Sequence, residues 1–339
     1  MADSLWERLE RDNGFPVRVM LSLTERCPLR CGHCYLADRD TPNELSLEEI
    51  ERLLDELVEL GVFRLSLTGG EPAMRPDLRA IVEAAWERRF LVSLKTSASL
   101  FERSDVEQLR KAGLSALHVS LYHDVATEHD RFVGMPGAWQ RAVDALEVFH
   151  GLNGISIVAS VLMDWNEGAV APLISMARAK GWTITIDPKV HRVNDGGDRS
   201  VRLRSLGPRL EAAMRDVPGS RRCAPAPAPD QAICNAGTSS VYVTSYGDVW
   251  LCPVMPVPIG NVREQRLREM WEGSAFRKKI VALTWSDSGT CMACEYRRFC
   301  ERCPGEAYLE HGEFARPATV DCGIAEAYAA IWASGGPDC

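Results

Sequence analysis

The segment of sequence that decides the fold is VRVMLSLTERCPLRCGHCY, residues 17–35. It joins a short apolar run, Val17–Leu23, to three cysteines, Cys27, Cys31 and Cys34, with the spacing C-x3-C-x2-C. The apolar run predicts a strand that is buried on both faces, with the cysteines in the loop after it. Three thiolates bind three corners of a cubane iron–sulfur cluster and leave one iron open to another ligand. A zinc site with His33 as the fourth ligand, or a set of buried free cysteines, are the alternatives at this point.

Five more apolar runs follow along the first two hundred residues, each with the length and branched side chains of a buried strand. They are Phe63–Leu67, Leu91–Thr96, Ala116–Leu121, Ile155–Val161 and Thr183–Asp187. Amphipathic helical patterns separate them, at 46–61, 77–89, 104–113, 139–149 and 168–180. Ser46 with Glu49, and Ser104 with Glu107, predict capping boxes at two of the helix starts. Six β–α units in succession predict an α/β fold, a partial (β/α)6 barrel of the TIM type whose working face lies at the carboxyl ends of the strands.

The sequence changes character after Asp187, where glycines, prolines and an Ala-Pro run at 224–229 indicate loops. A β-hairpin is predicted from Ser239–Thr244 and Val249–Leu251, then a helix near Leu267–Lys279, then a cysteine-dense stretch, Cys291–Cys322. This loop-rich part has little regular apolar pattern, so we expect metal to stabilise it. The predicted organisation is an N-terminal tail (1–16), a barrel (17–205), a linker (206–222), a cysteine-rich domain (223–325) and a C-terminal tail (326–339).

Composition and charge argue against several classes of function. The net charge of −8 and the isoelectric point near 5.5 disfavour nucleic acid as a partner, because phosphate binding needs a basic face. No window has the roughly 18 apolar residues of a membrane span, and the N-terminus has no secretory signal, so we expect a cytoplasmic protein without a membrane partner. In that reducing compartment, twelve cysteines predict metal or catalytic sites rather than disulfides. Three lie at 27–34 and nine from Cys223 onward, which predicts two metal regions, with Cys339 as a spectator.

A second motif, Gly69-Gly70-Glu71-Pro72, follows the second predicted strand. With the cysteine triplet and the Tyr35 that follows it, this motif makes the chain resemble the radical S-adenosylmethionine (SAM) superfamily. The resemblance implies that the open iron of a [4Fe–4S] cluster chelates the amino and carboxylate groups of SAM's methionine, while the Gly-Gly-Glu-Pro segment lines the amino group. It also implies reductive cleavage of SAM to a 5′-deoxyadenosyl radical, which takes a hydrogen atom from the substrate. A flavodoxin- or ferredoxin-type donor would supply the electron.

Four further residues occupy positions like those that contact SAM in the family, although the full family motifs are absent around them. Thr96 and Ser97 stand where many members have a Thr-Asn-Gly strand end, and Ser120 where many have Ser-x-Asp-Gly. The resemblance implies that these three contact SAM's carboxylate and ribose. Arg131 lies in a region like His-Asp-x-x-Arg-Gly with altered spacing, and it is a candidate for SAM's carboxylate. A surface arginine at a helix start is the alternative.

The cysteines of the C-terminal part resemble the SPASM extension of this superfamily, which generally holds two auxiliary [4Fe–4S] clusters. The pattern here is C-x12-G-x4-C, then C-x2-C-x5-C-x2-C, then a final cysteine; the last spacing is one residue shorter than the family's x3. Carried over by position, the first auxiliary cluster would be bound by Cys234, Cys252 and Cys303 with Cys223 as fourth ligand, and the second by Cys291, Cys294, Cys300 and Cys322. Three clusters in all are therefore implied. A zinc ribbon built on the two C-x2-C pairs is the structural alternative.

The substrate is harder to predict than the chemistry. SPASM proteins that resemble this one include maturases of ribosomally made peptides, and peptide oxidation or cross-linking is the first hypothesis. Pro253 follows Cys252 where sulfatase-maturing members have an aspartate, which disfavours that subgroup. Asp187, Lys189 and Asp248 are candidate acid–base groups or solvated residues. Because the first strand begins near residue 17, we expect a separate leader-binding protein to deliver a peptide. Small-molecule dehydrogenation or epimerisation is the second hypothesis, and a non-catalytic metal-binding interaction module the third.

Overall fold

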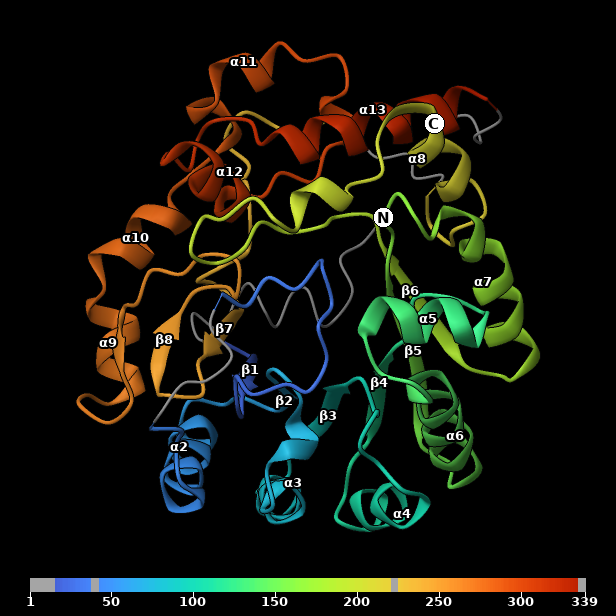
Figure 1. Ribbon diagram of the computed structural model, residues 1–339. Coiled ribbons are helices and arrows are strands. Elements are labelled where there is room, and N and C mark those ends of the chain that lie inside the picture. Colours follow the sequence, from blue (N-terminus) through green and yellow to red (C-terminus); the bar gives the residue numbers. More distant parts are fainter. Residues whose placement is uncertain (1–15, 38–42, 221–224, 335–339) are drawn as a thin grey trace.

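The computed structural model describes residues 16–37, 43–220 and 225–334 of the chain. Cys223, Cys339 and most of the predicted N-terminal tail lie outside these residues. Within them the central feature is one nine-stranded sheet in the order β6-β5-β4-β3-β2-β1-β7-β8-β9, and its two ends do not pair. Helices lie along the outside of its curved first part (Figure 1).

The six predicted barrel strands are confirmed, each within one residue at either end. They are β1 (Arg18–Ser22), β2 (Arg64–Thr68), β3 (Leu91–Thr96), β4 (Ala116–Ser120), β5 (Ile155–Val161) and β6 (Thr183–Asp187). Neighbours in the sequence pair in parallel from β1 to β6, as right-handed β–α–β crossovers require. The predicted partial (β/α)6 barrel is therefore confirmed, and it is an open sheet.

Helices that follow the strands cover the outer face of the barrel. They are α2 (Leu47–Glu59), α3 (Leu78–Glu87), α4 (Arg103–Lys111), α6 (Ala138–Gly151) and α7 (Val170–Ala179), with short 3-10 turns η1 (Pro72–Met74) and η2 (Glu167–Ala169). Helix α5 (Ala126–Val133) packs against the cysteine loop after β1. The capping box of α2 is confirmed: the Glu49 N–H donates to the Ser46 hydroxyl, and the Ser46 N–H donates to the Glu49 carboxylate at 2.8 Å.

The cap predicted for α4 is wrong. Ser104 lies inside the first turn, and the N-cap is Glu102, whose N–H donates to the Asp105 carboxylate at 2.8 Å. Two residue pairs here have the spacing of a capping box, Glu102 with Asp105 and Ser104 with Glu107, and the first of them caps the helix. Helix α5 was not predicted, because only His129 and Val133 of its eight residues are buried and its apolar periodicity is short.

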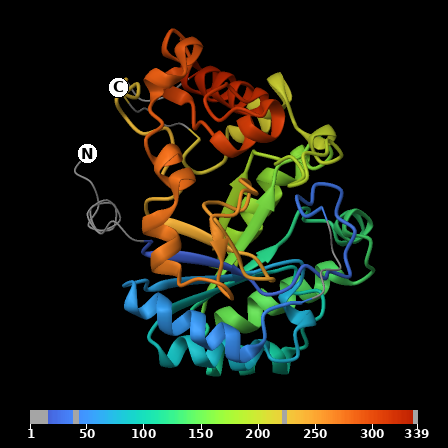
Figure 2. The ribbon, with the colours of Figure 1, turned by 90° about the vertical axis from the view of Figure 1, so that its left-hand side faces the viewer.

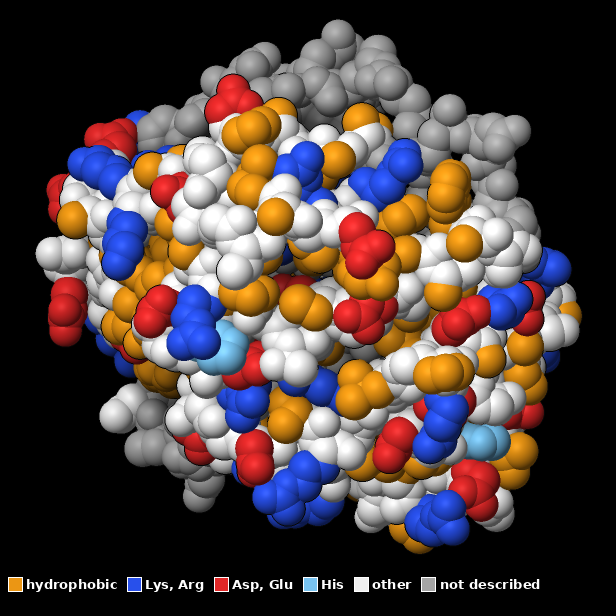
Figure 3. Space-filling view, turned by 90° about the horizontal axis from the view of Figure 1, so that it is seen from above, with side chains coloured by type: hydrophobic (Ala, Val, Ile, Leu, Met, Phe, Trp, Pro, Cys, Tyr) orange, Lys and Arg blue, Asp and Glu red, His pale blue; other side chains and the backbone are white. Residues whose placement is uncertain are grey.

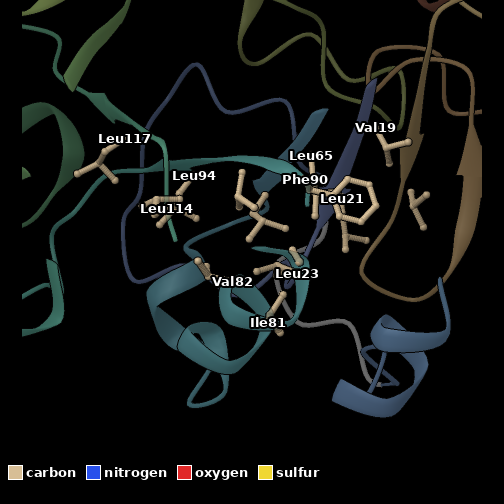
Figure 4. Close-up of a cluster of buried hydrophobic side chains, with 14 of the residues drawn as sticks. Val19, Leu21, Leu23, Leu65, Ile81, Val82, Phe90, Leu94, Leu114 and Leu117 are labelled. Carbon is tan, nitrogen blue, oxygen red and sulfur yellow. The ribbon is translucent and has the colours of Figure 1, made fainter. Parts of the chain in front are cut away.

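The core of the barrel lies between the strands and the outer helices. Val19, Leu21, Leu65, Ile81 and Val82 are each at most 2% exposed, and they meet where β1 and β2 pack on α3 (Figure 4). Each such side chain contributes about 1.5–3 kcal/mol by leaving water. Alternate strand residues point into the barrel instead, and several of these are polar.

The predicted hairpin is confirmed as β7 (Ser240–Val243) and β8 (Asp248–Trp250), which pair antiparallel and are followed by β9 (Gly260–Asn261). The sequence did not predict that β7 also pairs in parallel with β1, with Leu21 opposite Val243. The C-terminal part thus continues the sheet of the barrel. As a result, the end of β7 and the cysteine loop after β1 lie at the same edge of the sheet.

The remaining helices belong to the C-terminal part. They are α8 (Gly207–Met214), α9 (Leu267–Gly273), α10 (Ala275–Val281), α11 (Gly289–Met292), α12 (Pro304–His311) and α13 (Thr319–Ala333), with 3-10 turns η3 (Val201–Leu203), η4 (Trp285–Asp287) and η5 (Arg297–Phe299). Helices α8, α11, α12 and α13 lie at the end of the molecule opposite α2, α3 and α4, whereas α9 lies beside β8 and contacts α2 (Figures 1 and 2). The single helix predicted at 267–279 is two helices, because Ser274 leaves the helical conformation and caps α10 by accepting from the Arg277 N–H at 3.0 Å.

The cysteine-rich part has an apolar core that the sequence analysis did not anticipate. Helix α8 lies inside the predicted linker, and α13 continues past residue 325 into the predicted tail. Leu210 and Met214 of α8 pack with Val320, Ile324 and Ile331 of α13 in one buried cluster. Metal is therefore not the sole source of order in this segment.

Surface features of the described residues are mixed. The end of the molecule seen from above carries acidic and basic side chains interspersed among apolar ones (Figure 3). Among the described helices, none combines the length and the apolar character needed to span a membrane.

Candidate functional site

Three free cysteines, Cys27, Cys31 and Cys34, lie in the loop that leaves the carboxyl end of β1, and each is partly exposed. The loop is fixed by Arg30, whose guanidinium donates to the Cys27 carbonyl at 2.9 Å and whose backbone N–H donates to the Val133 carbonyl of α5 at 2.9 Å. The loop is therefore anchored at the working face of the barrel by contacts of the protein itself.

The Gly-Gly-Glu-Pro motif is built directly against this loop. The Gly70 N–H donates to the Thr24 carbonyl at 2.7 Å, and the Glu71 N–H donates to the Arg26 carbonyl at 2.8 Å. A Cβ on Gly69 would lie 2.3 Å from the Thr24 carbonyl oxygen, and one on Gly70 would lie 2.4 Å from that of Arg26. Both glycines are required because two backbones touch here, and Gly69 also has a positive φ of 141°. The two sequence motifs form one structural unit.

Glu71 joins the ends of β2 and β3. Its carboxylate is fully buried and accepts from the Thr96 hydroxyl at 2.5 Å, the Ser97 N–H at 2.8 Å and the Ala73 N–H at 3.1 Å, and also from the Ser97 hydroxyl. A buried carboxylate is stable here because each oxygen has two donors. The structure thus brings together Glu71, Thr96 and Ser97 beside the cysteine loop, at the place where the sequence resemblance put SAM contacts.

Tyr35 is also in this region, while Arg131 is not. Burial raises the pKa of Tyr35 well above its usual value, with Glu25, Cys34 and Cys252 as nearby groups. The Arg131 guanidinium is 74% exposed and pairs with Glu128 on the same helix. Arg131 is therefore a surface residue in this structure, which was the alternative to a contact with SAM's carboxylate.

Aromatic side chains beside the cysteines were missed by the sequence analysis. Tyr122, two residues past the predicted contact Ser120, is buried, and its pKa is raised by burial and then by the neighbouring Cys31. The His33 ring meets the Tyr122 ring edge-on at 4.8 Å and stacks on Phe132 at 5.4 Å. His33 thus has an aromatic environment in the midst of the cluster loop.

Two interior polar residues of the barrel were also not predicted as site residues. Lys95 of β3 and His118 of β4 are partners in the sheet register. Burial, and then the charge of Lys95, lower the pKa of His118 to about 4, and burial lowers the pKa of Lys95. The alternation of apolar and polar residues along β3 and β4 was the signal that could have placed them inside the barrel.

Glu25 was missed as well. It is 4% exposed, accepts from the Ser22 hydroxyl at 3.0 Å and the Ser245 hydroxyl at 3.2 Å, and so links the end of β1 to the segment after β7. Burial raises the pKa of its carboxyl. No local sequence pattern announces this link, since Ser245 is 220 residues away.

The described cysteines of the C-terminal part form two sets, defined by which thiols interact with one another. The first set is Cys234, Cys252 and Cys303; the second set is Cys291, Cys294, Cys300 and Cys322. Cys252 neighbours Cys234 and Cys303, and Cys322 neighbours Cys291, Cys294 and Cys300. The division is the one implied by the SPASM resemblance, with Cys223 outside the described residues.

The chemistry of both sets fits cluster ligands, because all seven cysteines are free and cysteine thiolates are the ligands of [4Fe–4S] clusters. Burial raises the pKa of Cys252 to about 11 and that of Cys303 to about 12. A cavity of about 630 Å³ is lined by Cys234 of the first set and Cys300 of the second. Among the described residues no three His, Cys, Asp or Glu side chains are close enough to share one metal ion. A cubane does not need that, because each of its thiolates binds a separate iron.

The shortened turn between Cys300 and Cys303 is fixed by Arg302. Its guanidinium is buried and donates to the carbonyls of Ala315 and Arg316 at 2.8 and 2.7 Å. Those carbonyls precede α13, which carries Cys322. Arg302 therefore connects the Cys300–Cys303 turn to the start of α13. It also lies within the C-x2-C spacing that is one residue shorter than the family pattern.

The three candidate acid–base residues have structural partners. The Lys189 ammonium lies 2.6 Å from the Asp321 carboxylate. Asp187 accepts the Lys189 backbone N–H at 2.8 Å, and Asp248 accepts from the Asn261 amide at 2.9 Å. Asp248 thus shapes the β8–β9 connection.

Comparison with known proteins agrees with this geometry. The family model of the radical SAM superfamily matches residues 21–177, and that of the iron–sulfur cluster-binding SPASM domain matches residues 234–304. The AdoMet-dependent heme synthase of Methanosarcina barkeri is 27% identical, over 88% of this chain and 94% of its own length. The PqqA peptide cyclase of Granulibacter bethesdensis is 26% identical, over 83% and 80%.

Solved structures share the fold. Streptococcus suis SuiB bound to the precursor peptide SuiA superposes with a TM-score of 0.67 and 18% identity, over 93% of this chain and 78% of that one. The structure of anSMEcpe with bound AdoMet and the Kp18Cys peptide gives a TM-score of 0.71 and 13% identity, over 93% and 97%. The barrel and the cysteine-rich part described above are thus found together in other proteins.

Proposed function

This chain belongs to the radical SAM superfamily and carries an iron–sulfur cluster-binding SPASM domain, and from that membership we propose that it is a peptide-modifying enzyme. We assign Cys27, Cys31 and Cys34 to the SAM-binding [4Fe–4S] cluster. When bound, the cluster and SAM supply a 5′-deoxyadenosyl radical by one-electron reduction. The substrate would lose a hydrogen atom to it and then be oxidised or cross-linked.

The observation that carries the proposal is the direct contact between the cysteine loop and the Gly-Gly-Glu-Pro motif. Glu71 fixes Thr96 and Ser97 beside the loop, so three strand ends present polar groups to one place. Preorganised groups bind a polar cofactor without reordering, which favours a defined position for SAM relative to the substrate. Tyr122 is buried and Tyr35 is half-buried beside the cysteine loop, so both rings limit the access of water to it.

A peptide substrate is supported by the likeness to PqqA peptide cyclases and by the fold shared with SuiB. We propose that a separate leader-binding protein delivers the peptide, that a flavodoxin- or ferredoxin-type protein supplies electrons, and that the reaction takes place in the cytoplasm. We further propose two auxiliary clusters, held by the first and second cysteine sets with Cys223 as the remaining ligand. They would accept the electron that an oxidised substrate releases.

Action on a small molecule is the second candidate. It is favoured by the likeness to AdoMet-dependent heme synthase, which extends over 94% of that relative.

The test is an anaerobic assay of the purified protein with SAM and dithionite, in which 5′-deoxyadenosine is quantified. The wild-type protein is expected to hold about twelve irons, corresponding to three cubanes, and to form 5′-deoxyadenosine. Adding candidate precursor peptides is expected to raise that yield for the substrate peptide and to change its mass by the loss of two hydrogens. No 5′-deoxyadenosine from a protein with full iron content would contradict the enzyme assignment. Product formation with a small molecule alone would favour the second candidate.

A further inference from the structure

A buried ion pair connects the barrel to the cysteine-rich part. Lys189 lies in the loop after β6, and Asp321 lies on α13. The Lys189 ammonium is 2.6 Å from the Asp321 carboxylate, and the two side chains are 15% and 3% exposed. Burying two charges costs several kcal/mol per ion, and removal of one partner leaves an uncompensated charge. A pair in such a place therefore exerts a strong local field.

Both charges contact the backbone of the turn that carries Cys300 and Cys303. The Lys189 ammonium donates to the Glu301 carbonyl at 3.1 Å, and the Asp321 carboxylate accepts from the Cys303 N–H at 2.7 Å. This turn contributes one cysteine to the second set and one to the first. The ion pair is thus placed between the two sets.

The two residues also lie close to further ligands along the chain. Asp321 directly precedes Cys322 of the second set, and the Glu301 carbonyl that Lys189 contacts lies between Cys300 and Cys303.

We propose that Lys189 and Asp321 tune, in opposite directions, the reduction potential of the auxiliary cluster held by the first set. This inference rests on the proposed function, because it requires that cluster. Reduction adds a negative charge to a cluster, so a nearby cation favours the reduced form and a nearby anion disfavours it. Lys189 therefore raises the potential and Asp321 lowers it.

A purely structural role is less suited to this pair, because another buried carboxylate already joins the same two parts. Glu306 of α12 is fully buried and accepts from the Arg204 guanidinium at 2.8 Å, from the His191 ring at 2.9 Å and from the Arg192 N–H at 2.9 Å. The loop after β6 is thus attached to α12 without Lys189.

The test is an EPR-monitored redox titration of the full-length holoenzyme and its variants. Addition of SAM identifies the SAM-binding cluster, because its spectrum changes, and the remaining signals belong to the auxiliary clusters. Lys189→Gln removes the charge and keeps a hydrogen-bond donor, and it is expected to shift the first auxiliary cluster to a lower potential. Asp321→Asn is isosteric and is expected to shift it to a higher potential. The double variant is expected to return near the wild-type value.

The matched control is Lys180→Gln, which breaks the exposed Lys180–Glu147 ion pair on the barrel surface and is expected to leave every potential unchanged. Shifts of the same sign in both single variants, no shift in either, or a double variant further from wild type than both would overturn the proposal. If the Lys189→Gln protein loses the cluster, two other variants test the proposal. Asp321→Asn must raise the potential, and Lys189→Arg, which conserves the charge, must leave the potential unchanged. Wild-type protein with SAM cleavage but only four irons would refute the auxiliary clusters themselves, and with them this inference, while the SAM-cleaving assignment would stand.

Discussion

Replacing Glu71 by glutamine is expected to lower the free energy of unfolding by about 2–4 kcal/mol. One carboxylate oxygen accepts from Thr96 and the Ala73 N–H, and the other accepts from the Ser97 hydroxyl and N–H. In glutamine one of these oxygens becomes an amide NH2, which donates and does not accept. Either orientation leaves one backbone N–H, that of Ala73 or Ser97, without an acceptor. An unsatisfied buried donor costs about 1–3 kcal/mol, and loss of the charge weakens the remaining bonds by roughly another 1 kcal/mol.

Urea unfolding of the Glu71→Gln protein, followed by circular dichroism under anaerobic conditions, measures the global effect. Hydrogen exchange at the Ala73 and Ser97 amides measures the local one, and protection of at least one of the two is expected to fall. Glu107→Gln is the control, because Glu107 pairs with Arg103 on the surface of α4 and its loss is worth less than about 1 kcal/mol. Unfolding within 0.5 kcal/mol of wild type, together with unchanged exchange at both amides, would refute the role of Glu71 as the link between the strand ends.

Three further changes test other parts of the site. Gly70→Ala places a Cβ 2.4 Å from the Arg26 carbonyl oxygen, so it is expected to displace the cysteine loop and to reduce SAM binding, measured by calorimetry, at least tenfold. Cys34→Ala is expected to abolish 5′-deoxyadenosine formation while about two thirds of the iron remains; loss of all iron would contradict two separate metal regions. Burial lowers the pKa of His129 to about 4, whereas its pKa in the unfolded chain is about 6.5. As pH falls through this window, the unfolded chain binds a proton that the folded protein does not. The free energy of unfolding is therefore expected to fall by up to about 3 kcal/mol between pH 6.5 and 4. His129→Gln should flatten this dependence in acid unfolding curves, leaving the part that belongs to His118.

The fold of the barrel was predictable because its strands are buried on both faces. Runs such as Leu91–Thr96 and Ile155–Val161 are apolar and branched along their whole length, and helical periodicity separates them. The errors lie where two signals compete or where none exists. The cap of α4 had two candidate pairs, and the packing of α8 on α13 joins segments that no window of the sequence contains together.

The candidate site shows the same limit. The cysteine spacing and the Gly-Gly-Glu-Pro motif were visible as local patterns, but their contact was not, because it depends on two backbones meeting at the edge of a sheet. Glu25, Lys95 and His118 were missed because a polar residue in or beside a strand has no signature of its own. Their roles follow only from the register of the strands and from the segment after β7.

The pairing of β7 with β1 has a consequence for how the two metal regions work together. Without the C-terminal part, β1 would present an unpaired edge, and an exposed edge in an otherwise buried parallel sheet favours misassembly. The barrel and the cysteine-rich part are also joined by Glu306, which is fully buried and pairs with Arg204. These two attachments, one through the sheet and one through a buried carboxylate, connect the cysteine-rich part to the strand that leads into the cysteine loop. If both cysteine regions hold clusters, as we propose, the extended sheet fixes the separation between them.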